Sequence, residues 1–115
     1  MASTTIDPAV FETLKEAVGE DFIGELIETY LNDAPTLIAE IRRNLKEGNA
    51  DTLRRVAHSL KSNSGNFGAT QVVELAKALE MAAKSGTLEG APEMLTRLEA
   101  EYRQAADELR QWAAG

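Results

Sequence analysis

The chain has 115 residues, the usual size of one domain and enough to bury a hydrophobic core. Its 19 acidic and 12 basic side chains give a net charge of −7, which disfavours nucleic acid and anionic membranes as partners. It has no cysteine, so disulfides, thiol nucleophiles and cysteine-based zinc sites are excluded. We therefore expect one domain over residues 1–115.

Targeting signals are also missing from the sequence. No apolar run is long enough to cross a membrane, and the first residues lack the basic and apolar pattern of a secretion signal. These features predict a cytoplasmic protein.

The first two helices are predicted from caps and apolar spacing. Asp7 and Pro8 form a typical helix start, and Gly19 is expected to end this helix in a left-handed conformation. Its buried side is predicted to hold Phe11, Leu14 and Val18. A second, long helix is predicted over 20–47, with Pro35 bending it or splitting it in two. Its apolar stripe is Ile23, Ile27, Tyr30, Ala34, Leu37, Ile41 and Leu45.

Three further helices follow. The third is predicted over 51–64, capped by Asn49 or Asp51, and the run 65–68 is expected to end it. The fourth is predicted over 70–84, burying Val72, Leu75, Leu79 and Ala82. The fifth is predicted to begin at Pro92 and to run close to the C-terminus, burying Met94, Leu98, Tyr102, Ala105, Leu109 and Trp112.

The pattern predicts an all-α fold. No segment alternates with the period of a strand, and short loops between long helices favour antiparallel neighbours. We expect an up-and-down antiparallel four-helix bundle, with the additional short N-terminal helix covering one end.

The only histidine, His58, is the main candidate for chemistry. At 100° per residue it lies about 140° from Leu53 on the apolar stripe, so its imidazole should face solvent. Arg54, Arg55 and Lys61 share its face and provide positive charge. Neutral imidazole is a good nucleophile, and nearby cations stabilise the oxygens of a phosphoryl group.

Small side chains continue this face after the histidine. Ser62 and Gly65 lie one and two turns further along the helix, where bulk would obstruct a docking protein. Gly65 and Gly68 could instead be ordinary helix-end residues, and a single histidine is more often structural or merely exposed.

Residues 57–69 resemble the signature of histidine-containing phosphotransfer (HPt) domains of bacterial multistep phosphorelays. They read Ala57-His58-Ser59-Leu60-Lys61-Ser62-Asn63-Ser64-Gly65-Asn66-Phe67-Gly68-Ala69. Residues 30–38 and 45–49 are also similar to that family. The resemblance implies that His58 accepts a phosphoryl group and that Lys61 stabilises it.

The same resemblance implies partners and a neighbouring residue. The expected partners are receiver domains of response regulators and a hybrid sensor histidine kinase, and the receiver would supply Mg²⁺, so that this chain needs no cofactor of its own. Several family members carry a glutamine on the next helix that hydrogen-bonds the histidine or the phosphate, and Glu80 is the corresponding residue here. A carboxylate could orient the imidazole but would repel a phosphoryl group.

Two alternatives remain at this stage. The chain could be the dimerisation and phosphoacceptor module of a sensor kinase, although Ser59 stands where that module usually has an acidic residue. It could also be an adaptor bundle without chemistry. No phosphate-binding loop or kinase signature is present, so we expect a monomeric phosphoryl carrier without kinase activity of its own. One histidine among scattered acids is a poor metal site.

Overall fold

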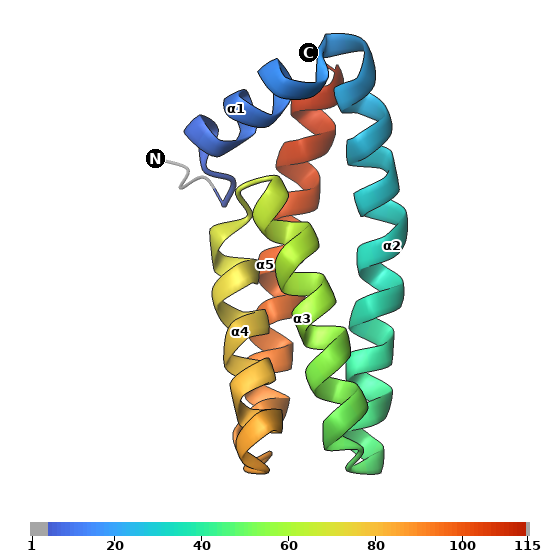
Figure 1. The fold of residues 1–115 in the computed structure, drawn as a ribbon, viewed down its shortest axis with the longest axis vertical. Coiled ribbons are helices and arrows are strands. Elements are labelled where there is room, and N and C mark those ends of the chain that lie inside the picture. The colour runs from blue at the N-terminus through green and yellow to red at the C-terminus, as the bar shows by residue number, and fades with distance from the viewer. Residues whose placement is uncertain (1–4, 115) are drawn as a thin grey trace.

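The protein is described here by a computed structural model that covers residues 5–114, with side chains to residue 112. Five helices follow in order: α1 (Pro8–Val18), α2 (Glu20–Glu47), α3 (Ala50–Asn66), α4 (Thr70–Ser85) and α5 (Ala91–Ala114). The four long helices run alternately down and up, and α1 lies across the end where α2 begins (Figure 1). The predicted bundle with an additional N-terminal helix is confirmed.

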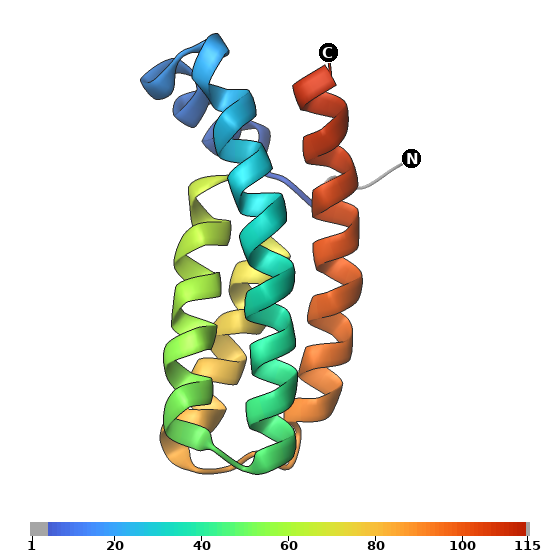
Figure 2. The same ribbon diagram turned by 90° about the vertical axis from the view of Figure 1, so that its right-hand side faces the viewer.

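The bundle closes in a ring of four neighbours. Helix α3 packs between α2 and α4, α5 packs between α4 and α2, and Figure 2 shows α2 beside α5. Two seams therefore lie on opposite sides of the core: the α3–α4 seam and the α2–α5 seam.

Helix α1 begins as predicted but ends differently. The Asp7 side chain accepts a hydrogen bond from the backbone of Ala9, and Pro8 lies in the first turn. Phe11 is buried, whereas Leu14 and Val18 are only partly buried. Gly19 has φ +91° and ψ 153°, which is not the expected left-handed helical conformation. Glycine can adopt this extended geometry at positive φ. Gly19 is therefore both the C-cap of α1 and the N-cap of α2.

Helix α2 passes through Pro35 without a break, so the alternative of two helices is wrong. Pro35 is exposed and lacks an N–H, so the helix continues through it with one backbone hydrogen bond fewer. Leu37 and Leu45 are only partly buried. The residues buried on α2 are Ile23, Ile27, Tyr30, Ala34, Ile38, Ile41 and Asn44.

Helix α3 is longer than predicted. It runs from Ala50 to Asn66, so Gly65 is helical and the turn comes only at residues 67–69. Asn49 occupies the N-cap position without a capping side-chain bond. The late end follows from packing, because Phe67 is buried and closes the end of the core beside Tyr30, with ring centroids 5.0 Å apart.

The last two helices depart from the prediction by one residue in several places. Ala83, not Ala82, is buried on α4, and α5 begins at Ala91, not at Pro92. Met94 and Trp112 are partly buried. The residues buried on α5 are Ala91, Leu95, Leu98, Tyr102, Ala105, Ala106 and Leu109.

The residues before α1 fasten the turn between α3 and α4. Ile6 forms an isolated antiparallel bridge with Ala69, and the Asp7 amide donates to the Gly68 carbonyl at 2.7 Å. Gly68 has φ +77°, and a Cβ there would lie 2.9 Å from Cβ of Val10. Only glycine lets the N-terminal segment approach the turn this closely. This contact fixes one end of the α3–α4 seam, which carries His58.

Candidate functional site around His58 and Glu80

His58 lies on the outer face of α3, and 58% of its side chain is exposed. The buried residues of this helix, Leu53, Val56, Ala57, Leu60 and Ser64, turn toward the core on the other side. The predicted outward orientation of the imidazole is confirmed. A partner protein can therefore reach the ring without any rearrangement of the bundle.

Glu80 of α4 joins the two main candidate residues. Its Oε2 lies 2.9 Å from Nδ1 of His58, and its Oε1 lies 2.7 Å from Nζ of Lys61. The Glu80 side chain lies at the surface of the seam and is partly buried, with 19% exposed. One carboxylate therefore connects both residues across the α3–α4 seam.

The charge state of Glu80 determines what this bridge does. The hydrogen bond from Lys61 lowers the pKa of Glu80 below its ordinary value, and the bond with His58 lowers it further. Glu80 is therefore an anion at neutral pH and can only accept hydrogen bonds. An imidazole that bonds this carboxylate through Nδ1 donates from that nitrogen, and in the neutral ring the lone pair is then on Nε2.

The two arginines expected near the histidine have another partner. Arg54 and Arg55 bond the two carboxylate oxygens of Asp51, at 3.2 and 3.0 Å. Asp51 is predicted as a possible helix cap, whereas its spacing of three and four residues from the arginines is the signal for these ion pairs. Lys61 is thus the cation that the structure brings to His58, through Glu80.

Ser62 and Gly65 are both exposed, in line with a clear surface beside the histidine. A Cβ added to Gly65 would meet only a methyl group of Val73, at 3.8 Å, which is ordinary contact. Gly65 is therefore not required by the packing of the bundle.

A buried hydrogen bond supports the site from behind. Ser64, on the inner face of α3, bonds the hydroxyl of Tyr30 at 2.7 Å inside the core. Burial raises the pKa of Tyr30 far above its ordinary range, so the phenol stays neutral. The pair fixes α3 against α2 and was not foreseen from the sequence, because nothing local indicates that residues 34 positions apart will meet.

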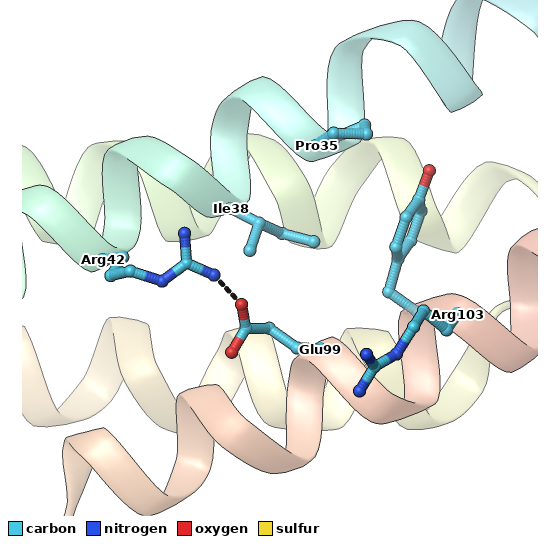
Figure 3. Close-up of a pocket in the computed structure, with 6 residues that line it drawn as sticks. Pro35, Ile38, Arg42, Glu99 and Arg103 are labelled. Carbon is cyan, nitrogen blue, oxygen red and sulfur yellow. Dashed lines mark ion pairs between the residues drawn. The ribbon is translucent and has the colours of Figure 1, made fainter.

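A cavity of about 210 Å³ lies on the opposite side, in the α2–α5 seam. Figure 3 shows Arg42 of α2 and Glu99 of α5 facing each other across it as an ion pair. Its other lining residues are Pro35, Ile38, Tyr102 and Arg103. None of the predicted site residues borders this cavity.

Metal and membrane features are not found in the described part of the chain. Residues 5–114 hold no cluster of three metal-ligating side chains. None of their helices combines the length and the apolar character that a membrane span requires.

Comparisons with known proteins agree with the fold. A family model described as "Hpt domain" matches residues 25–112. The chain is 25% identical to the phosphorelay protein LuxU of Vibrio harveyi over 89 residues, covering 77% of this chain and 78% of LuxU. The crystal structure of histidine-containing phosphotransfer protein B (HptB) from Pseudomonas aeruginosa PAO1 superimposes with a TM-score of 0.93 at 29% identity, covering 98% of this chain and 97% of HptB. The chain therefore belongs to the Hpt family and is a histidine-containing phosphotransfer protein of a phosphorelay.

Proposed function

We propose that His58 is the residue that carries the phosphoryl group. The observation behind this assignment is the exposed imidazole whose Nδ1 is held by Glu80, which leaves the Nε2 lone pair available. His58 is also the only histidine in the chain. The family's chemistry requires one, and no other residue can take its place.

The proposed transfer is an in-line displacement. The Nε2 lone pair attacks the phosphorus of an aspartyl phosphate on a receiver domain, the acyl oxygen–phosphorus bond breaks, and the aspartate leaves as a carboxylate with the bonding electrons. Onward transfer is the reverse step: a second aspartate attacks phosphorus and the nitrogen–phosphorus electrons return to Nε2. In such reactions most of the catalysis comes from positioning and from charge stabilisation.

Lys61 supplies that stabilisation from this chain. Its ammonium group lies on the turn after His58 and is 28% exposed, so it can move from Glu80 toward phosphoryl oxygens. In the complex the receiver domain would supply Mg²⁺, which would neutralise negative charge on the phosphoryl group. This chain brings no cofactor of its own to the reaction.

The proposed partners follow from the same scheme. A hybrid sensor histidine kinase delivers the phosphoryl group through its receiver domain, and a response regulator takes it. The protein acts as a monomer, because a single exposed imidazole on one bundle suffices for both docking events. Both events are expected to take place in the cytoplasm.

The direct test is transfer from a phosphorylated receiver domain, followed as acid-labile label on this protein. The wild type should become labelled and pass the label to a second receiver. His58→Gln should take up none, while Glu99→Gln, in the opposite seam, should behave as the wild type. Label that persists in His58→Gln would show that another residue is the acceptor.

A further inference from the structure

We propose that the groove between α2 and α5 is a docking site for an acidic amphipathic helix of another protein. This site lies in the seam opposite the one that carries His58 and does not depend on the transfer proposed above. The cavity of about 210 Å³ already described is one half of the groove. A second cavity, of about 440 Å³, shares Arg42 and Glu99 with it. The groove therefore continues along the seam on both sides of this ion pair.

The length of the groove suits a helix of about three turns. Along α2 it extends from Pro35 to Lys46, which is about 17 Å at the rise of an α-helix. Ile38 borders the first cavity, and Leu45, seven residues or two turns further along α2, borders the second. A helix that docks in such a groove inserts side chains at this spacing. The bound helix should therefore present apolar side chains at positions i and i+7.

Apolar side chains form the floor of the groove. Ile38 and Leu95 are buried in it, whereas Leu45 and Leu88 are only partly buried and still expose apolar surface. The α2–α5 seam is also the least closely packed of the four seams between the long helices. A partner side chain that enters either cavity would cover this apolar surface, which stabilises the complex.

The rim of the groove is positively charged. Its cations are Arg42, Lys46 and Arg103, all three exposed, and Glu99 is the anion that borders it. Arg42 is already paired with Glu99, as Figure 3 shows. Lys46 and Arg103 form no ion pair with any side chain of residues 5–112. Carboxylates of an acidic helix would complement these two cations.

The net negative charge of the protein does not oppose an acidic partner at this groove. Residues 5–33 carry eight acidic side chains and one lysine, so residues 34–115 have equal numbers of acidic and basic side chains. The acidic part comprises α1 and the first half of α2, at the end of the bundle where α2 begins (Figure 1). Arg42 lies nine residues beyond Asp33, about 14 Å along the helix, and physiological salt screens exposed charges over about 8 Å. Local cations therefore govern the contact.

A partner in this groove would leave His58 accessible. The groove is lined by α2, by α5 and by Leu88 in the loop before α5, whereas His58 faces outward from α3 beside α4. The protein could therefore be held by one partner while its imidazole meets another. Such tethering raises the effective concentration of the carrier for a neighbouring receiver domain.

The test is binding of a fluorescent synthetic peptide, measured by anisotropy. The peptide is helical, with leucines at i, i+3, i+7 and i+10 on one face and glutamates on both sides of that face. It should bind the wild type, and more weakly in high salt. A matched peptide with glutamine in place of each glutamate should bind about tenfold more weakly. Absence of binding, or equal binding of the two peptides, would overturn the proposal.

Charge reversals locate the contact. Lys46→Glu combined with Arg103→Glu should weaken binding of the acidic peptide about tenfold, because both cations of the groove become anions. Lys77→Glu combined with Lys84→Glu makes the same change in net charge on exposed positions of α4 and should leave the affinity unchanged. Circular dichroism checks that both proteins are folded. Equal weakening by the two double variants would show that only overall charge matters, and the groove would be excluded.

Chemical-shift mapping with the same peptide distinguishes this groove from the His58 face. Amide shifts should change within 35–46 and 92–103, and His58 should still be labelled at the wild-type rate with the peptide bound. Changes centred on α3, or loss of labelling on adding peptide, would overturn the proposal of a separate site. Failure of labelling without peptide would instead concern the role of His58.

Two other occupants would give different results. A dimer of the free protein that is abolished by Lys46→Glu with Arg103→Glu would mean that a second copy fills the groove. Tighter binding of a single-stranded oligonucleotide than of the acidic peptide, lost in the same variant, would point to nucleic acid. Either result would overturn the proposal of an acidic helix.

Discussion

The two opposite seams of the bundle are built from similar helices but are held together in different ways. In the α3–α4 seam, Glu80 bonds both His58 and Lys61, and the turn at Gly68 is locked onto the N-terminal segment. The α2–α5 seam has the Arg42–Glu99 ion pair beside a cavity. Polar contacts are thus organised in the seam that carries the proposed phosphoacceptor His58, while the opposite seam mainly completes the core.

The two buried tyrosines, Tyr30 on α2 and Tyr102 on α5, differ in their hydrogen bonding. The hydroxyl of Tyr30, behind the site, is bonded to Ser64 at 2.7 Å. The hydroxyl of Tyr102, which lines the α2–α5 cavity, is the one buried side-chain polar atom among the described residues that lacks a hydrogen-bond partner. Their rings pack edge to face with centroids 5.9 Å apart. Neighbouring groups of the same type therefore differ in what their hydroxyls contribute.

The largest effect is expected at the turn that closes the α3–α4 seam. Gly68→Ala should lower the free energy of unfolding by about 3 kcal/mol, because an alanine there is strained in its backbone and collides with Val10 and Asp7. Gly48→Ala, at φ +71° with nothing within 4 Å of the new Cβ, should cost only about 1 kcal/mol. Urea unfolding measures both. Equal losses would show that the close approach at Gly68 adds nothing.

The next effect separates the two tyrosines. Tyr30→Phe leaves the buried hydroxyl of Ser64 without a partner and should cost about 2 kcal/mol in urea unfolding. Tyr102→Phe removes a hydroxyl that has no partner and should be neutral or slightly stabilising. Ser64→Ala added to Tyr30→Phe should recover part of the loss. A reversed order of the two tyrosine variants would contradict this difference between the two hydroxyls.

Lys61→Ala should slow phosphoryl transfer about tenfold while leaving the helical content unchanged, because a charge-assisted contact to the phosphoryl oxygens is lost. Arg42→Ala removes a cation from the opposite seam and should leave the transfer rate at its wild-type value. The rates come from label transfer, and circular dichroism checks the fold. An unfolded Lys61→Ala protein would mean that Lys61 serves mainly to hold the α3–α4 seam.

The smallest effect is a dependence of stability on acid. The pKa of Glu80 is lower in the folded chain than its ordinary value of 4.5, chiefly through the bond from Lys61. Its contribution to stability is therefore present above pH 4.5 and disappears as the pH falls through the folded-state pKa. Because the site is at the surface, we expect less than about 1 kcal/mol.

The check is the difference in unfolding free energy between the wild type and Glu80→Gln, measured at pH 7 and again below pH 4. The difference should shrink in acid. A difference that stays constant across this range would indicate that Glu80 is not held more strongly in the folded state.

Much of the architecture was predictable from local patterns. The bounds of α2 follow from the spacing of its apolar residues and from Gly48, and the outward direction of His58 follows from helical geometry alone. The predictions failed where packing decides between neighbours: Ile38 lies in the core where Leu37 was expected, and α3 continues through Gly65 until Phe67 fills the end of the core. An apolar stripe more than 100° wide allows either of two neighbouring residues to be buried, and packing against the partner helices decides which one is.

The site itself divides in the same way. The sequence alone determined that one histidine lies on the polar face of an amphipathic helix with Lys61 one turn away. The reason is that each residue of a helix is rotated by a constant angle from the one before it. Only the tertiary structure decided that Glu80, 22 residues further on, reaches Nδ1 of that histidine and Nζ of that lysine at once. The approach of two antiparallel helices fixes such distances, and no local rule can supply them.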